Sequence, residues 1–570
     1  MLQSVGPQVL NGWNAFNAAI TGGSVPLSDC DFFSVNVIGT WVGTLKWMGS
    51  LDNVNWFDMA LQNANGAVTP AVSLTSTGTD KNGNYFASAG SGLLYVRVVA
   101  SAWTSGTAYV YTAKHRGTYV SSQDFWDTAM PFTRDAVFAI DASRSSVGET
   151  VVVNAGSGGT ALNATLGSTG SADSNDPLLL PWTGTNYLYC PGVVGNYASA
   201  PGSAALDITG DIEIVVRVAM DDWTPTAAQV FASRINFSTN SSYRFLITSA
   251  GMLQFDYCPT SDWAVAINKA ATVAVPFADG TAGWVKVTFA VATGVASFYS
   301  STDGVSFSLL SATSSTGATS IGASTSALSI ASSGSGSGNL SGKFYRAIVR
   351  NGIGGPTVFD ADFTTGITSG AQTTFTESSS NAATVTINRG TAGRKCVAVT
   401  RPVWLFGTDD YMVVPDNALI NFNTTDDYTV LVVARLWDTQ TSFVKLLQKQ
   451  LPLSPTGNKG WDIRVNVWPS VGGSIGDGSA AGNFNQFSST IAATSGALMS
   501  VGSKRTGTSF NGFMNNTLSS TQTNSYDTTA VVAMAIGAGA IDMELLAVAV
   551  FRRALNATEI ASINTYYGTA

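Results

Sequence analysis

Apolar and polar residues alternate along much of the chain, and this pattern predicts strands rather than helices. The alternation is clear at 33–37 and continues with the same period of two at 45–49. Successive side chains of a strand point to opposite faces, so this period indicates sheets with one buried face. The glycine-containing stretch at 39–43 is typical of a turn between two strands, and a hairpin signal follows at 50–56.

Two further strands, 95–98 and 107–111, are predicted on either side of a turn at 104–106. Together these elements predict a small N-terminal β-sandwich over residues 1–120. Its motifs (GTWVGT, then SLDNVNW, then YVRV with WTSGT) resemble a domain that recurs in structural proteins of tailed phages, over residues 31–114. The resemblance implies that this domain anchors the protein to a virion.

The periodicity weakens over residues 121–180, where turn residues accumulate at 156–159 and 175–177. We interpret this segment as a connector with a few short strands that dock onto the next domain.

Two longer β-regions follow, and each repeats the pattern of the other. Each has a strand ending in proline, a loop, an acidic turn and a long apolar strand with one arginine. A repeat of this length indicates domain duplication. The matching segments are 184–191 with 407–415, 207–218 with 422–435, and, just before them, 149–154 with 383–388.

These motifs resemble the laminin-G-like, concanavalin-type jelly rolls. The resemblance implies a first jelly roll over 181–365 and a second over 366–570, so the predicted fold class is all-β with three sandwiches. The segment 543–560 is similar to the closing strand and short helix of that family. Asn556 and Glu559 have the spacing of a capping box, and Ile560, Ile563 and Tyr567 share one helical face.

Composition narrows the choice of function. Hydrophobic residues make up 45% of the chain and charged residues only 11%, so Ser, Thr, Asn and Gly must supply the solvated surface. The net charge is −8 and the basic residues are scattered, which argues against a nucleic-acid partner. The most apolar stretch, 531–551, is interrupted by charges and glycines, so it predicts two buried strands and no membrane span.

The four cysteines, Cys30, Cys190, Cys258 and Cys396, include no CxxC pair, which excludes a metal knuckle. Cys190 and Cys258 fall in one predicted domain and could form a disulfide. Buried free thiols are the favoured state in a chain with so few cysteines.

Acid–base chemistry finds little support in the sequence. Retaining glycosidases need two carboxylates about 5–5.5 Å apart. The chain has five glutamates, none near another, and only Asp211 and Glu213 share a strand face. The single histidine, His115, lies in a polar segment just beyond the first predicted domain. We therefore expect a protein that is not an enzyme, with no catalytic residues.

Binding is the more promising chemistry, although ordinary burial or solvation competes for every candidate. Paired acids on turns bring together the oxygen ligands that calcium requires, and exposed aromatic rings stack on sugars. No other cofactor is expected. The calcium candidates are Asp221, Asp222, Asp409, Asp410, Asp426 and Asp427, and the carbohydrate candidates are Trp223, Tyr243, Trp263, Trp437 and Trp461.

These observations predict a structural protein on the exterior of a tailed-phage virion, assembled in the host cytoplasm. The first 19 residues have no basic segment followed by an apolar core, so no cleaved export signal is expected. The resemblance implies a place on the tail or its fibres, a homotrimer, other virion proteins as partners, and a host-surface glycan as ligand. Alternatives are a capsid decoration protein or head fibre, a carbohydrate-active enzyme, and a bacterial surface adhesin, which would need an export signal or sorting tail.

Overall fold

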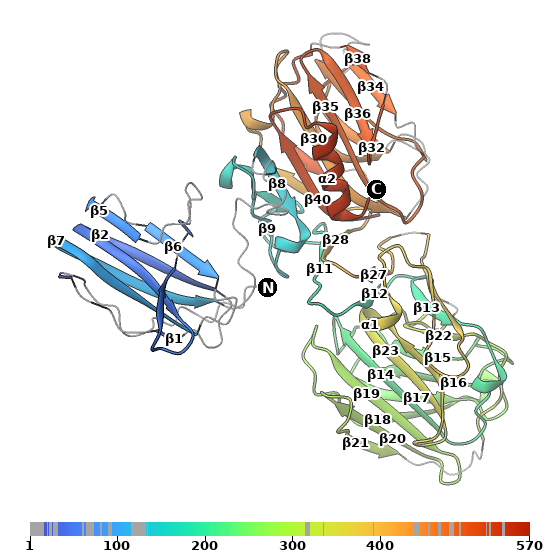
Figure 1. The fold of residues 1–570 in the computed structure, drawn as a ribbon. Coiled ribbons are helices and arrows are strands. Elements are labelled where there is room, and N and C mark those ends of the chain that lie inside the picture. Colours follow the sequence, from blue (N-terminus) through green and yellow to red (C-terminus); the bar gives the residue numbers. More distant parts are fainter. Residues whose placement is uncertain are drawn as a thin grey trace. The chain divides into compact units, whose positions relative to one another are not determined.

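Antiparallel sheets dominate the structure, a computed structural model, and the all-β class predicted from the sequence is confirmed (Figure 1). The chain forms two compact units, residues 1–136 with 155–157 and residues 137–154 with 158–570. No helix among the described residues is both long and apolar enough to cross a bilayer. The structure describes residues 16, 18–19, 21, 25–26, 32–59, 62–63, 73–79, 83–88, 94–115, 133, 135–313, 320–334, 336–391, 393–437, 444–453, 457–465, 469–477, 484–488, 492–519, 521–523, 526–537 and 542–569.

The N-terminal unit is built around two long strands, β2 (Phe32–Ser50) and β7 (Tyr95–His115), which pair along their whole length. Five shorter strands complete a seven-stranded antiparallel sheet, and Trp41 and Trp47 lie in the core on its buried side. The shorter strands are β1 (Val25–Pro26), β3 (Trp56–Asp58), β4 (Gln62–Asn63), β5 (Ser73–Gly78) and β6 (Gly83–Ser88).

Both turns predicted inside these strands, at 39–43 and at 104–106, are wrong. Gly39 and Gly106 have positive φ values, 121° and 84°, and the strands bend there without reversing. A Cβ atom at Gly39 would lie 2.3 Å from the Thr107 carbonyl oxygen, so only glycine permits this approach. His115, expected beyond the domain, is the last residue of β7.

Two jelly rolls make up the second unit, each with two antiparallel sheets. We name residues 187–399 the first roll. Its sheet A runs β21-β20-β19-β14-β23-β12-β27 with β24 beside β23, and its sheet B runs β18-β17-β16-β15-β22-β13-β26-β25. The strands are β12 (Tyr187–Pro191), β13 (Tyr197–Ala200), β14 (Ile212–Met220), β15 (Gln229–Ser233), β16 (Tyr243–Ile247), β17 (Met252–Tyr257), β18 (Ile267–Ala274), β19 (Gly283–Ala290), β20 (Val295–Ser301), β21 (Ser308–Thr313), β22 (Leu328–Ile330), β23 (Ser341–Asn351), β24 (Thr357–Asp362), β25 (Thr374–Thr376), β26 (Thr384–Asn388) and β27 (Val397–Val399).

The second roll consists of residues 136–180 together with 403–569. Its sheet C runs β11-β28-β40-β30-β35-β36-β37 with β38 beside β36 and β8 beside β40, and its sheet D runs β34-β33-β32-β31-β39-β29-β10-β9. The strands are β8 (Ala136–Asp141), β9 (Val151–Val152), β10 (Ala164–Leu166), β11 (Leu178–Leu180), β28 (Val403–Phe406), β29 (Met412–Val414), β30 (Tyr428–Leu436), β31 (Val444–Leu453), β32 (Gly457–Val465), β33 (Val471–Asp477), β34 (Phe484–Ser488), β35 (Leu498–Thr506), β36 (Ser509–Met514), β37 (Thr517–Leu518), β38 (Gln522–Thr523), β39 (Met534–Ile536) and β40 (Met543–Phe551).

Equivalent four-strand segments complete the two rolls, and we call them the closing segments. In the first roll the closing segment is β24 to β27, which directly follows β23. In the second roll it is β8 to β11, which precedes the whole first roll in the chain. The pairings correspond one to one, since β24 with β23, β26 with β13 and β27 with β12 match β8 with β40, β10 with β29 and β11 with β28.

The strand pairing therefore divides the chain differently from the predicted boundaries. Residues 136–180, predicted as part of a connector, belong to the sheets of the second roll. Residues 366–399, predicted within the second roll, pair with the first. Partners more than 200 residues apart leave no local signal in the sequence, which explains the difference.

Local predictions near the C-terminus are confirmed. The apolar stretch 531–551 contains two buried strands, β39 and β40. The last helix, α2 (Ala557–Tyr567), begins with the capping box of Asn556 and Glu559. Ile560, Ile563 and Tyr567 are buried along one face, as the spacing predicts.

Candidate functional site

Arg435 and Glu544 form the polar centre of the best candidate site. They lie directly opposite each other on β30 and β40. Their neighbours Ala434 and Leu545 point into the core, so the two charged side chains project from the other face of sheet C. Arg435 Nη1 forms an ion pair with Glu544 Oε2, and Trp437 Nε1 donates to Glu544 Oε1 at 2.5 Å.

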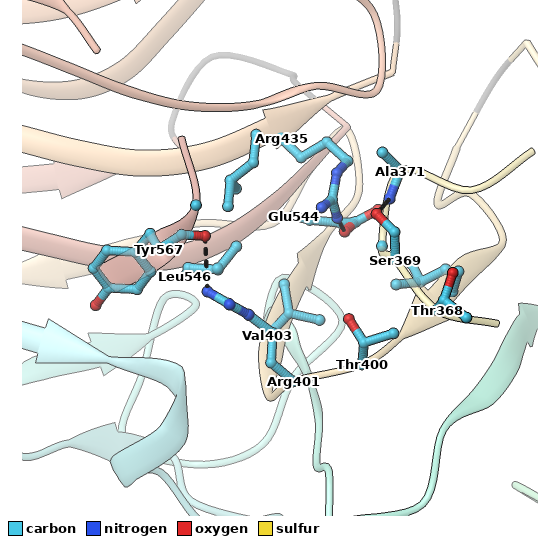
Figure 2. Close-up of a pocket in the computed structure, with 15 residues that line it drawn as sticks. Thr368, Ser369, Ala371, Thr400, Arg401, Val403, Arg435, Glu544, Leu546 and Tyr567 are labelled. Carbon is cyan, nitrogen blue, oxygen red and sulfur yellow. Dashed lines mark hydrogen bonds and ion pairs between the residues drawn. The ribbon is translucent and has the colours of Figure 1, made fainter. Parts of the chain in front are cut away.

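A cavity of about 240 Å³ opens beside this pair, as Figure 2 shows. Its lining includes Thr368 and Ser369 from the loop after the short helix α1 (Phe363–Gly366). A Cβ atom on Gly370 would lie 2.5 Å from Arg435 Nη1, so the glycine lets this loop come close to the guanidinium.

Arg435 carries an unused donor in the cavity wall. Its side chain is buried, with 8% exposed, and Nε has no hydrogen-bond partner in the described part of the chain. A buried N–H without a partner costs about 1–3 kcal/mol, which a ligand oxygen would recover. This cavity is therefore equipped to accept a polar ligand.

A second cavity of about 390 Å³ adjoins the first and supplies aromatic surface. The two cavities share Thr400, Arg401, Leu546 and Tyr567. We call them together the junction groove. Arg401 Nη1 donates to the Tyr567 carbonyl oxygen at 3.1 Å, which holds the shared wall in place.

Two exposed rings line the second cavity, Trp182 with 38% and Tyr566 with 40% of its surface exposed. Trp182 Nε1 donates to Asn186 Oδ1 at 2.8 Å, which fixes the orientation of the indole. Tyr566 packs edge-to-face on Tyr567, with 4.9 Å between the ring centroids. Exposed rings held in fixed orientations are suited to stacking on the apolar faces of sugars.

The hydroxyl of Tyr567 anchors this wall from below by donating to Asp141 Oδ2. Burial, followed by the nearby Asp141 carboxylate, raises the pKa of Tyr567 well above its ordinary value, so the phenol remains a donor.

The aromatic residues predicted from the sequence lie elsewhere. Trp223, Tyr243 and Trp461 are buried in the cores of the rolls, which leaves no ring face open to a ligand. Trp263 is half-buried, with the Phe237 ring edge-on at 5.2 Å and the Arg244 guanidinium over it at 4.8 Å.

Trp437 comes nearest to the junction groove, since its indole holds Glu544. Its own ring is covered by the Arg389 guanidinium, 3.6 Å from the ring centroid. Sequence reasoning missed Trp182, Tyr566 and Arg435. Only the helical face could have indicated one of them, because a buried Tyr567 leaves Tyr566 pointing outward.

The acidic pairs do not gather into a metal site. Among the described residues, no group of three or more His, Cys, Asp or Glu side chains is arranged to hold a metal ion. The oxygens of Asp221 accept from Tyr189 and Ser341, and calcium binding at the pairs stays a prediction. The other acids accept as follows: Asp222 from Thr224, Asp410 from Arg394 and Gly407, Asp426 from Arg552 and Asn423, and Asp427 from Gly507, while the Asp409 carbonyl accepts from Asn175.

The two acids considered for glycoside hydrolysis serve separate structural roles. Glu213 forms an ion pair with Arg350, and Asp211 Oδ1 accepts from the Val291 backbone N–H at 2.8 Å. These contacts account for both carboxylates without catalysis.

Comparisons with known proteins agree with the architecture. No family model matches the sequence, and no curated protein matches it. Mouse laminin α1 chain domains LG4-5 are 11% identical, with a TM-score of 0.25, over 68% of this chain and 96% of that one. A heptameric pentraxin from Limulus polyphemus is 13% identical, with a TM-score of 0.23, over 30% of this chain and 77% of that one.

The binding domain of Paraclostridial Mosquitocidal Protein 1 is 13% identical, with a TM-score of 0.26, over 35% of this chain. The match spans only 51% of that domain's own chain. At such identities each similarity concerns the fold alone. The sheets themselves place the protein in the all-β class, with two laminin-G-like, concanavalin-type jelly rolls.

Proposed function

We propose that the protein is a non-enzymatic glycan-binding protein whose junction groove holds a sugar against Trp182 and Tyr566. The observation that carries the proposal is the meeting of two exposed rings with a polar cavity. A pyranose has an apolar face that stacks on rings and hydroxyls that need partners, and the groove offers both. Arg435 Nε and Arg401 would serve as donors to its oxygens.

An array of bacterial surface polysaccharides, probed with the purified protein, tests this proposal. Trp182→Ala and Tyr566→Ala should each weaken binding about tenfold or more, since aromatic stacking contributes about 0.5–1.5 kcal/mol beyond area burial. Tyr109→Ala, which removes a ring 44% exposed in the N-terminal unit, is the matched control and should change nothing. Unchanged binding by both groove variants would overturn the proposal.

The absence of catalysis is part of the proposal. Within the groove, Glu544 is held by Arg435 and Trp437, and Asp141 by Tyr567, which occupies both carboxylates with structural contacts. Incubating the same polysaccharides with the protein should release no new reducing ends. Release that disappears in Glu544→Gln or Glu213→Gln would favour the alternative of a carbohydrate-active enzyme.

The finer part of the proposal concerns where the protein acts. We infer a homotrimeric virion protein on the tail or fibres of a phage, anchored by the N-terminal domain. Its support is the sequence resemblance of residues 31–114 and the low share of charged residues, 11%. Electron microscopy of particles labelled through the C-terminus should show the label on the tail. Label over the capsid would favour the decoration or head-fibre alternative, and unlabelled particles would exclude a virion role.

A further inference from the structure

The outer face of sheet A in the first roll carries a separate cavity of about 380 Å³, which we call the sheet A groove. Its floor is one row across three neighbouring strands. Lys286 on β19 lies opposite Val215 on β14, which lies opposite Ile348 on β23. Because the strands alternate, these side chains point away from the core that Val285 and Val349 help to fill.

One wall of the groove is held rigidly by the turn between β20 and β21. The Ser301 hydroxyl donates to Asp303 Oδ1, and the same oxygen accepts from the backbone N–H groups of Val305 and Ser306 at 2.8 Å. These backbone hydrogen bonds lower the pKa of Asp303 to about 2. The turn therefore keeps one shape at neutral pH and presents Phe307 to the groove.

Gly304 of this turn packs on Trp284. It has a φ of +75°, and a Cβ atom there would lie 2.5 Å from the indole. Trp284 and Phe307 together form an aromatic wall.

The opposite wall consists of two arginines whose charges are already balanced. Arg350 forms an ion pair with Glu213, and Arg346 binds Asp360 in a two-pronged contact with N···O distances of 2.6 and 2.7 Å. These pairs fix the guanidinium groups while leaving other N–H groups available as donors.

Lys286 is the exception among the charges of the groove. Its Nζ lies between two rings, 4.6 Å from the centroid of Tyr299 and 4.3 Å from that of Phe307. Among the described residues, no carboxylate forms an ion pair with it. The groove thus combines an aromatic wall, several donors and one uncompensated cation.

We propose that the sheet A groove binds an anionic saccharide, with the carboxylate or sulfate on Lys286 and the sugar ring against Trp284 and Phe307. This inference rests on the proposed glycan-binding function but uses residues that the junction groove does not. An anion is favoured over a neutral sugar because the lining supplies donors and a positive charge, while its one carboxylate, Glu213, is already neutralised.

Titration calorimetry with the full-length protein tests the inference, with three probes: oligogalacturonate for a carboxylate, low-molecular-weight dextran sulfate for a sulfate, and neutral dextran. At least one anionic probe should bind and neutral dextran should not. Lys286→Met should weaken that binding about tenfold, and Lys286→Arg should largely restore it. Lys46→Met, at a partly exposed lysine of the N-terminal unit, is the matched control.

The outcomes separate this inference from the proposed function. If neither anionic probe binds, or if Lys286→Met binds as the natural protein does, the inference is wrong. If Trp182→Ala abolishes the anionic binding while Lys286→Met spares it, the anion occupies the junction groove and the inference is again wrong. Loss of polysaccharide binding in Trp182→Ala, with anion binding retained, supports both. Thermal unfolding of each variant shows that it is folded.

Discussion

Tyr567, at the end of α2, donates its hydroxyl hydrogen to Asp141, a residue 426 positions earlier in the chain. This contact joins the last helix to the closing segment of the second roll. The chain enters the second roll with β8 to β11, builds the whole first roll, and then returns to finish the second. The two rolls are thus repeats in which the final closing segment has been supplied from the front.

The closure makes a prediction about fragments. A fragment of residues 183–400 contains every strand of the first roll and should unfold cooperatively on heating. A fragment of residues 403–570 lacks the partners of β28, β29 and the outer side of β40, which would leave sheet edges and core residues exposed. Circular dichroism should show it unfolded alone and structured after a peptide of residues 136–180 is added. Cooperative unfolding of the 403–570 fragment without the peptide would contradict the closure.

A second prediction concerns cysteine chemistry. Cys190 and Cys396 have their sulfur atoms 3.5 Å apart and continue the pairing of β12 with β27. Both are free and buried, as is Cys258, in line with the free thiols favoured from the sequence, while Cys30 lies outside the described residues. The hydrogen bond from Cys396, together with burial, raises the pKa of the Cys190 thiol well above its ordinary value.

Native protein should therefore react slowly with iodoacetamide at Cys190 and Cys396, because the thiolate is the reactive form. Refolding with oxidised glutathione should join these two sulfurs, as two thiols lose two electrons and two protons and two glutathione thiols form. Peptide mass mapping identifies the bond. A link between Cys190 and Cys258, the pair suggested by the sequence, would show that this arrangement of β12 and β27 is not the one that forms.

What the sequence predicted and what it missed follow from the range of the interactions. The capping box at Asn556 depends on residues three apart, and the jelly-roll repeat depends on alternation along single strands, so both are visible locally. The junction groove depends on Trp182 meeting Tyr566, which requires the closing segment to pair with strands more than 200 residues away. Nor does a tryptophan's own sequence say whether its ring faces the core, which is why Trp223 and Trp461 were attractive candidates for sugar binding.

A third prediction concerns the ion pair of the junction groove. Glu544→Ala would leave Arg435 buried without its carboxylate, and breaking a buried pair in this way typically costs about 3–5 kcal/mol. The free energy of unfolding, measured with urea, should fall by about that amount. Asp58→Ala breaks the exposed Lys46–Asp58 pair and should cost less than about 1 kcal/mol. Equal small effects of both variants would mean that the Arg435–Glu544 pair is solvated in solution.

The last prediction concerns acid. Hydrogen bonds from Val305 and Ser306 lower the pKa of Asp303 to about 2, from an ordinary value of 3.8. A carboxyl whose folded pKa is lowered stabilises the fold above its unfolded pKa, and this contribution is lost as the pH falls through the folded value. The turn that carries Phe307 should thus keep its shape down to about pH 4 and loosen between about pH 4 and 2.

Nuclear magnetic resonance of the Val305 and Ser306 amide protons checks this, since both signals should shift together across that interval. In Asp303→Ala the two amides have lost their acceptor, so their signals should lie near the acid-state positions at every pH. The same variant should also weaken anion binding in the sheet A groove, because Phe307 is no longer held against Lys286. Amide signals that titrate near pH 4 in the natural protein would show that the turn does not bind the carboxylate as strongly as its hydrogen bonds indicate.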